Sequence, residues 1–287
     1  MKFLLLPAVP HGRPARGSSQ DIKIARAGVV MVTRFIKQSI VFPLAIAAYK
    51  GRPFFGFLRY FAVLREFYTY RRLVKQQGAD EHLAFRNFYP WLVDKYQPAG
   101  NVDLYFYQDT WCARKLAGSR PKMHVDVGSN LLTAGIMSQY TDLIFVDMRH
   151  LAIDLPGLSF RAGTLTNLPF DSNSVESISS LSVVEHVGLG RYGDPLDARG
   201  TDRACKELGR ILRPGGALYV AVPTEKQAST HFNAHRVFTT DDFIAKFPDL
   251  YLAEERYATT NGLLDRKQYE EAGMPYAYGC FHFGKNP

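Results

Sequence analysis

Three short segments of the chain carry side chains whose types and spacing suit the binding of a small polar ligand. The first, His124–Asn130, has the pattern of a buried strand that turns sharply at Gly128 and opens a helix. Ser129 and Asn130 are both favourable helix N-caps. The free backbone N–H groups of such a turn, together with the carboxylate of Asp126, predict a site for a polar ligand.

The second segment ends the next predicted strand, where Asp147 stands 21 residues after Asp126. An acidic residue about 20 residues after a strand with a glycine turn can accept hydrogen bonds from ribose hydroxyl groups. Asn130 and Leu132 occupy the places where a dinucleotide site has its further glycines, so we expect a nucleoside ligand without a pyrophosphate. An acid that only caps a helix or a turn is the alternative for Asp147.

The third segment, Gly188–Pro195, follows another predicted strand, and charged and aromatic side chains stand before it, within it and farther along the chain. Such side chains can orient the reactants of an in-line group transfer and accept a proton from a hydroxyl group. The candidate catalytic residues are Glu185, His186, Arg191, Tyr192, His235 and Arg236. A structural role, in packing or in a salt link, is the alternative for these residues. No metal site is expected, because the histidines show no carboxylate–histidine spacing.

The elements that must position these residues follow from the hydropathy pattern after residue 122. Strands are predicted at residues 122–127, 142–147, 159–162, 177–182, 217–222, 250–256 and 277–283. Helices are predicted at residues 131–139, 201–212 and 240–246. This alternation predicts a mostly parallel sheet with helices on both faces, in which ligands bind at the carboxyl ends of the strands.

With these motifs the chain resembles the class I S-adenosylmethionine-dependent methyltransferases over roughly residues 103–283. Asp126-Val127-Gly128 matches the start of their acid-x-Gly-x-Gly cofactor loop, and Asp147 matches their ribose-binding acid. Leu168–Asp171 followed by Val183–Val187 looks like their LPF…EHV segment, and Leu212–Leu218 looks like the L-x-P-G-G turn before the fifth strand. The resemblance implies a Rossmann-like α/β fold with a mostly parallel seven-stranded sheet whose last strand is antiparallel.

The resemblance also implies S-adenosyl-L-methionine as the cofactor. The cofactor-binding residues that it implies are Asp126, Gly128, Ser129, Asn130, Asp147, Met148, Thr164 and Leu165. Two positions depart from the family pattern. The cofactor loop lacks its second glycine, and Gly163-Thr164-Leu165 stands where a Gly-Asp-Ala-like triplet supplies an adenine-contacting acid. Thr164 can still form a hydrogen bond with an adenine edge.

Three further segments look like a family of uncharacterised methyltransferase-like proteins often encoded with bacterial surface-polysaccharide genes. They are Tyr105–Asp109, Gly188–Pro195 and Phe232–Phe238. This likeness implies a small-molecule or glycan-type acceptor. The alternatives are a methyltransferase-like binding module without catalysis and an RNA methyltransferase. Nucleic acid is not the expected partner, because no RNA-stacking module is present in the sequence.

The net charge of +8 is concentrated at the start of the chain. Residues 1–78 hold 14 Lys and Arg against 2 acidic residues, whereas residues 79–287 hold 21 against 25. We therefore expect a basic, aromatic-rich helical extension over residues 1–100 and a methyltransferase-like domain over residues 101–287. Residues 1–78 would contact an anionic surface, lipid headgroups or nucleic acid, or else form a solvated extension.

Residues 54–77 have apolar and aromatic positions at helical spacing, which fits an interfacial helix or a helix packed on the main domain. A transmembrane span is not expected, because the longest uncharged run in residues 22–49 has 12 residues and about 18–20 are needed. The three cysteines are far apart and predict a reducing compartment. The expected location is cytoplasmic. Peripheral contact with the inner face of the membrane is a further expectation. A short helix is also predicted within residues 84–96, and a strand-like start that turns into a helix within residues 103–116.

Overall fold

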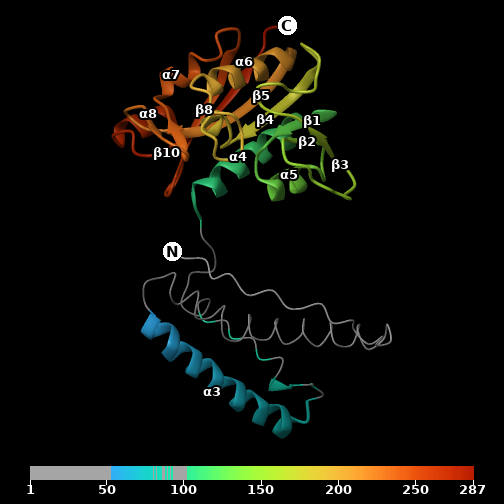
Figure 1. The fold of residues 1–287 in the computed structure, drawn as a ribbon, viewed down its shortest axis with the longest axis vertical. Helices are drawn as coiled ribbons and strands as arrows, with labels where there is room; N and C mark the ends of the chain where they lie inside the picture. The colour runs from blue at the N-terminus through green and yellow to red at the C-terminus, as the bar shows by residue number, and fades with distance from the viewer. Residues whose placement is uncertain are drawn as a thin grey trace, which may run out of the picture. The chain divides into compact units, whose positions relative to one another are not determined.

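The structure is a computed structural model that describes residues 53–79, 81, 83–85, 88, 90, 92 and 102–287. The chain divides into two compact units, residues 1–100 and 101–287 (Figure 1). The predictions for residues 1–52 lie outside the described residues, as does most of the helix predicted within residues 84–96.

The first unit contributes the helix α3, Pro53–Gln77, where the sequence predicts a helix at residues 54–77. The side chain of Phe67 packs edge to face on Phe88, with ring centres 5.2 Å apart. The hydroxyl of Tyr70 donates to the Glu81 carboxylate at 2.8 Å, so the segment after the helix folds back along it. Among the described residues, none of the helices combines the length and the hydropathy needed to cross a membrane.

The second unit is built on one eight-stranded sheet in the order β3-β2-β1-β4-β5-β10-β8-β9. The strands are β1 (Met123–Val127), β2 (Asp142–Asp147), β3 (Leu158–Ala162), β4 (Val175–Leu181), β5 (Leu212–Thr224), β8 (Tyr251–Thr259), β9 (Gly262–Leu264) and β10 (Ala277–Gly284). Strands β1 to β5 pair in parallel, and β10 runs antiparallel between β5 and β8. The mostly parallel sheet with an antiparallel last strand is therefore confirmed. The sheet has eight strands rather than seven because β9 pairs with β8 as a hairpin.

Helices cover both faces of this sheet, with α6 on one face and α4 and α5 on the other (Figure 1). They are α4 (Leu104–Ser119), α5 (Leu131–Met137), α6 (Gly200–Ile211), α7 (Thr240–Ile244) and α8 (Arg266–Glu271), with the short 3-10 helix η4 (Val184–His186). A small hairpin, β6 (Ser229–His231) and β7 (His235–Val237), follows β5. The prediction of a strand-like start before α4 is wrong. Asp103 caps this helix by accepting a hydrogen bond from the Phe106 N–H at 3.0 Å, so the helix begins at Leu104.

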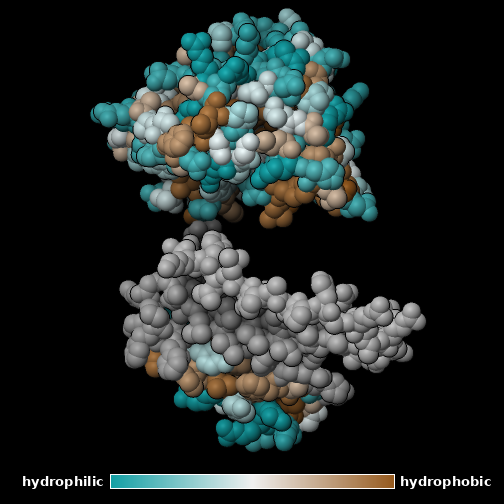
Figure 2. Space-filling view, viewed as in Figure 1, coloured by the Kyte–Doolittle hydropathy of each residue, from teal (hydrophilic) through white to brown (hydrophobic). Residues whose placement is uncertain are grey.

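Helix α6 shows why the sequence folds this way locally. Its residues Ala204, Cys205, Leu208 and Ile211 recur at helical spacing and are all fully or almost fully buried. On the opposite face of the sheet, α5 presents an exposed apolar surface that includes Leu132, 72% exposed (Figure 2).

The Pro214-Gly215-Gly216 turn lies inside β5 rather than before it. Leu212 pairs with Val175 of β4 and Ala217 pairs with Ser177, so the residues between them loop out of the ladder. Gly215 has a φ of +71°, which favours glycine. A Cβ at Gly216 would lie 2.9 Å from two backbone oxygens. Helix α6 is therefore joined to the sheet directly at Leu212, before this turn.

Candidate functional site

A cavity of about 390 Å³ opens at the carboxyl ends of β1, β2 and β4 and under the loops that follow β3 and β4. Its lining consists of Val127, Gly128, Val146–Arg149, Gly163–Thr166, Ser182, Val183, His186–Gly188, Tyr192, Asp194, Pro195 and Asp197. This is the edge of the sheet at which the sequence predicts a ligand site.

The glycine turn after β1 forms one wall of the cavity. Gly128 has a φ of +71°, and its N–H donates to the Val146 carbonyl at 2.9 Å. A Cβ at this position would lie 3.0 Å from a methyl group of Val183, so glycine lets this side chain pack directly against the backbone of the turn. The carboxylate of Asp126 is fully buried behind the turn, where it accepts hydrogen bonds from the Ser129 N–H and the Ser179 hydroxyl. Burial raises the pKa of Asp126 to about 6.

The other predicted residues of this turn support it from outside the cavity. The Ser129 hydroxyl accepts a hydrogen bond from the Leu181 N–H of β4 at 2.9 Å. The side chain of Asn130 caps α5 by accepting a bond from the Leu132 N–H at 2.9 Å. Of the four predicted residues in this turn, the cavity is therefore lined by Gly128, and the other three hold its backbone in place.

Asp147 lies at the rim of the cavity and is bound by Arg149, a residue that the sequence reasoning missed. Arg149 donates from Nε to Oδ1 at 2.9 Å and from Nη2 to Oδ2 at 2.7 Å. Burial raises the pKa of Asp147, but the hydrogen bonds and charge of Arg149 outweigh burial and hold it below its ordinary value. The same guanidinium lies 5.3 Å from the ring centre of Tyr192. Arg149 thus connects the end of β2 to the loop after β4.

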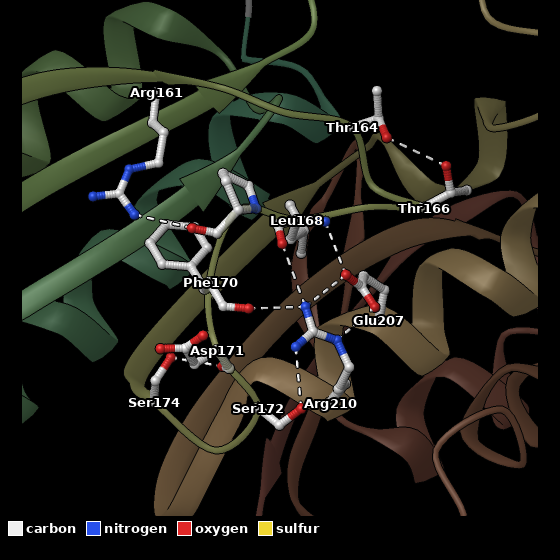
Figure 3. A network of polar contacts seen from close by, with 11 residues as sticks. Arg161, Thr164, Thr166, Leu168, Phe170, Asp171, Ser172, Ser174, Glu207 and Arg210 are labelled. Atoms are coloured by element: carbon white, nitrogen blue, oxygen red, sulfur yellow. Dashed lines mark hydrogen bonds and ion pairs between the residues drawn. The ribbon is translucent and has the colours of Figure 1, made fainter.

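Met148, Thr164 and Leu165 complete the wall on the side of β2 and β3. The hydroxyl groups of Thr164 and Thr166 lie 3.3 Å apart at its edge (Figure 3). A Cβ at Gly163 would lie 2.7 Å from the Pro169 ring, which shows how tightly the Leu168–Asp171 segment packs beneath this wall.

Two side chains of α6 hold that segment (Figure 3). Glu207 accepts a hydrogen bond from the Leu168 N–H at 2.8 Å. Arg210 donates to the carbonyl oxygens of Leu168 and Phe170, at 3.3 and 2.9 Å, and forms an ion pair with Glu207. At the other end of α6, the Thr201 hydroxyl donates to the Val184 carbonyl of η4 at 2.8 Å. Helix α6 therefore contacts the segments behind two walls of the cavity.

The loop after β4 places His186 in the cavity wall. Its Nδ1 lies 2.5 Å from the Ala234 carbonyl oxygen, which can only accept, so Nδ1 carries the proton and Nε2 has a free lone pair. Burial lowers the pKa of His186 to about 4, so the ring is neutral at pH 7. Ser182, just before this loop, has a φ of +58°, an uncommon conformation for a non-glycine residue.

Glu185 is fully buried next to His186, with Oε1 3.6 Å from the imidazole Nε2. Within the described part of the chain, its two carboxyl oxygens are the buried side-chain polar atoms that have no hydrogen-bond partner. Such a group costs about 1–3 kcal/mol of folding free energy. Burial raises its pKa to about 8, so the protonated form prevails at pH 7.

The remaining predicted catalytic residues lie around this pair. Arg191 donates to the Ala234 carbonyl at 3.1 Å and stacks 5.2 Å from the ring centre of Tyr192. The ring of His235 lies 6.3 Å from that of His186. Arg236 lies beneath the loop, where it donates to the Val187 carbonyl at 2.7 Å and does not line the cavity. The structure thus brings five of the six candidates together and places Arg236 as a support of the backbone. Of the six, His186 and Tyr192 line the cavity, whereas Glu185, Arg191 and His235 lie outside its lining.

Comparisons with known proteins add a partial family match. A family model described as "Caenorhabditis protein of unknown function, DUF268" matches residues 167–244. No curated protein matches the chain.

Among solved structures, the [4+2]-cyclase SpnF is 12% identical over 62% of this chain and 81% of its own, with a TM-score of 0.46. The geranyl diphosphate C-methyltransferase from Streptomyces coelicolor A3(2) is 12% identical over 61% of this chain and 78% of its own, with a TM-score of 0.46. The Burkholderia thailandensis 1,6-didemethyltoxoflavin-N1-methyltransferase is 14% identical over 79% and 89%, with a TM-score of 0.44. None of these likenesses assigns an activity to this chain.

Proposed function

We propose that residues 101–287 form an S-adenosylmethionine-dependent methyltransferase that acts on a small-molecule or glycan-type acceptor. The observation that carries the proposal is the cavity of about 390 Å³ between the glycine turn at the end of β1 and the Asp147 carboxylate at the end of β2. Its size falls in the range of roughly 300–1,000 Å³ in which proteins bind small ligands.

The charges around the cavity support a cationic ligand. Its lining includes three carboxylates, and two of them form ion pairs, Asp147 with Arg149 and Asp197 with Arg203. The third, Asp194, has no ion pair with a basic side chain in the described part of the chain and accepts hydrogen bonds from backbone N–H groups. His186 is neutral at pH 7 because burial lowers its pKa. A negatively charged, partly enclosed wall favours a cation over an anion. S-adenosylmethionine carries a positive charge on its sulfur, and when bound it supplies a methyl group to a nucleophile.

The chain's own residues would hold this cofactor by their position. Gly128 lines the cavity, so the cofactor would lie against the backbone after β1. Asp147 would accept hydrogen bonds from ribose hydroxyl groups, and Met148 and Leu165 would cover the adenine faces with apolar surface. The hydroxyl of Thr164 stands at the edge of the same wall and would contact the base. Glu185 and His186 would take up the proton that an acceptor hydroxyl loses.

A binding module without catalysis is the second candidate, and one contact favours it. The bidentate pair between Arg149 and Asp147 uses the carboxylate that the ribose would need. A nucleoside must displace this guanidinium or share Asp147 with it, which weakens binding.

The cellular setting is also a proposal. The chain's likeness to methyltransferase-like proteins of surface-polysaccharide gene clusters supports a role in cell-surface metabolism. The excess of basic residues in positions 1–78 and the exposed Leu58 and Tyr68 of α3 support peripheral contact with an anionic membrane. Flotation of the full chain with anionic vesicles, lost at high salt, tests this contact. Equal flotation with neutral vesicles would contradict the electrostatic part.

Calorimetry with S-adenosylhomocysteine tests the cofactor assignment. The full chain should bind it, and Asp147→Asn should weaken binding at least about tenfold, equivalent to roughly 1.4 kcal/mol. Asp154→Asn is the matched control, because Asp154 is exposed after the same strand and lies outside the cavity lining. Absence of binding at millimolar ligand would overturn the assignment.

A further inference from the structure

Glu185 lies where residues from several separate elements meet at the carboxyl edge of the sheet. Because β10 is antiparallel to β5 with Ala277 opposite Thr224, the first residues of β10 lie at the carboxyl end of β5. Tyr276 and Tyr278 therefore lie at the edge of the sheet from which the loop after β4 also extends. Burial raises the pKa of both phenols, and the charge of Glu185 makes a smaller contribution in the same direction.

The rings around Glu185 form a continuous series. The ring centres of Tyr278 and Tyr276 are 6.1 Å apart, and those of Tyr276 and His235 are 6.4 Å apart. His235 in turn lies 6.3 Å from His186, which lines the cavity. The series therefore leads from the cofactor cavity to Tyr276, whose side chain is 40% exposed.

The two unpartnered oxygens of Glu185 are the second observation. The imidazole Nε2 of His186 lies 3.6 Å from Oε1, yet no group in the described part of the chain forms a hydrogen bond with the Glu185 carboxyl oxygens. The hydroxyl of Tyr278 donates to the Tyr105 hydroxyl at 2.9 Å instead. Buried polar groups in native proteins are nearly always satisfied, so an unsatisfied carboxyl group indicates a partner that arrives from outside the chain.

The surrounding charges select the kind of partner. Arg191 lies close enough to lower the pKa of Glu185, His186 and His235, although burial is the largest influence on each. His231 also lowers the pKa of His235. The neighbourhood of Glu185 therefore disfavours a second positive charge, which argues against an ammonium group. A hydroxyl group both donates and accepts one hydrogen bond, as a protonated carboxyl group does.

We propose that Glu185, Tyr276, Tyr278 and His235 form an acceptor subsite for a neutral hydroxyl compound, whose hydroxyl group binds Glu185 and is the group methylated. This inference rests on the proposed function. The hydroxyl oxygen forms the new bond to the methyl carbon while the carbon–sulfur bond breaks and leaves its electron pair on sulfur. The sulfonium becomes a neutral thioether, and the hydroxyl proton passes to Glu185 in its ionised form, which is the minor form at pH 7.

Carboxyl carbon NMR on the full chain labelled with ¹³C-carboxyl glutamate tests the subsite directly. Glu185→Gln assigns the signal, which should titrate near pH 8. Benzyl alcohol and benzylammonium chloride serve as probes of matched shape, each at millimolar concentration in the presence of S-adenosylhomocysteine. Benzyl alcohol should shift the Glu185 signal, and benzylammonium should leave it in place.

Variants of the exposed tyrosine sharpen the test. Tyr276→Ala should reduce the response of the Glu185 signal to benzyl alcohol at least threefold, whereas Tyr68→Ala, which removes an exposed tyrosine of α3, should leave it unchanged. A Glu185 signal that ignores benzyl alcohol, or that responds more to benzylammonium, would overturn the subsite. If the unmodified chain did not bind S-adenosylhomocysteine, the proposed function would be overturned instead. This binding is measured separately from the response of the Glu185 signal to benzyl alcohol.

Discussion

Arg149 binds both carboxylate oxygens of Asp147, two residues before it, and at the same time stacks on Tyr192 of the loop after β4. Arg149 therefore competes with a ligand for the Asp147 carboxylate. It also links the end of β2 to the loop after β4. Its guanidinium is largely exposed, so the pair is worth about 0.2–1 kcal/mol.

Removal of Arg149 should therefore strengthen nucleoside binding. We expect Arg149→Ala to bind S-adenosylhomocysteine about two- to fivefold more tightly in calorimetry, because the ligand no longer has to break the ion pair between Arg149 and Asp147. Arg114→Ala, an exposed arginine of α4, is the matched control. Weaker binding by Arg149→Ala would mean that the guanidinium contacts the ligand itself.

Glu185 should make folding stability fall as pH rises. Its pKa is about 8 in the folded protein against an ordinary value of 4.5, so the folded state holds a proton that the unfolded state releases between these values. Glu185→Gln removes this loss, and its free energy of unfolding at pH 8.5 should exceed that of the unmodified chain by at least about 1 kcal/mol. Urea unfolding at pH 4.5 and 8.5 measures the difference. Glu271→Gln, an exposed glutamate of α8, should show no such gain.

Loss of Arg236 should loosen the loop after β4. Its guanidinium donates to the Val187 carbonyl and to the Thr201 hydroxyl from a partly buried position. Hydrogen bonds of charged groups contribute about 1.5–3 kcal/mol, so Arg236→Ala should lower the free energy of unfolding by about this amount. Limited proteolysis should then cut within residues 188–195 faster than in the Arg114→Ala control. An unchanged cleavage rate would contradict the supporting role.

A side chain at Gly163 should push the Leu168–Asp171 segment away from the cavity wall. The Cβ of Gly163→Ala would lie 2.7 Å from the Pro169 ring, and such overpacking costs about 1–3 kcal/mol. Gly118→Ala is the matched control, because a Cβ in that helical position meets no atom within 4 Å. We expect this control to be neutral or more stable in thermal unfolding. Equal stability of the two variants would show that the wall can yield.

The long, periodic elements of the second unit could be predicted from sequence. Burial of one or both faces of a helix or strand requires apolar residues at regular spacing, which the sequence shows. Strands of three residues could not be predicted. The hairpin β6–β7 and the strand β9 have three residues per strand and depend on contacts with distant segments. The cap at Asp103 was visible in the sequence but outweighed by the aromatic run that follows it.

The residues of the candidate site could be predicted where they stand at the carboxyl end of a predicted strand. Asp147 and Gly128 both line the cavity. The use of each side chain was harder to foresee, because it depends on partners far away in the sequence. Arg236 is a candidate catalytic residue in the sequence, yet its guanidinium forms hydrogen bonds with carbonyl oxygens of the loop. No local signal marks Tyr276, which stands just before β10 and whose ring lies 6.4 Å from that of His235.

Helix α6 sets a fixed spacing inside the protein. Thr201 holds η4 at its first turn, and Glu207 holds the Leu168 segment six residues later, about 9 Å along the axis at 1.5 Å per residue. Because a helix moves largely as one body, a shift of the wall behind which η4 lies would also move the wall behind which the Leu168 segment lies. Helix α6, and not only the surrounding loops, therefore sets the distance between these two walls of the cavity.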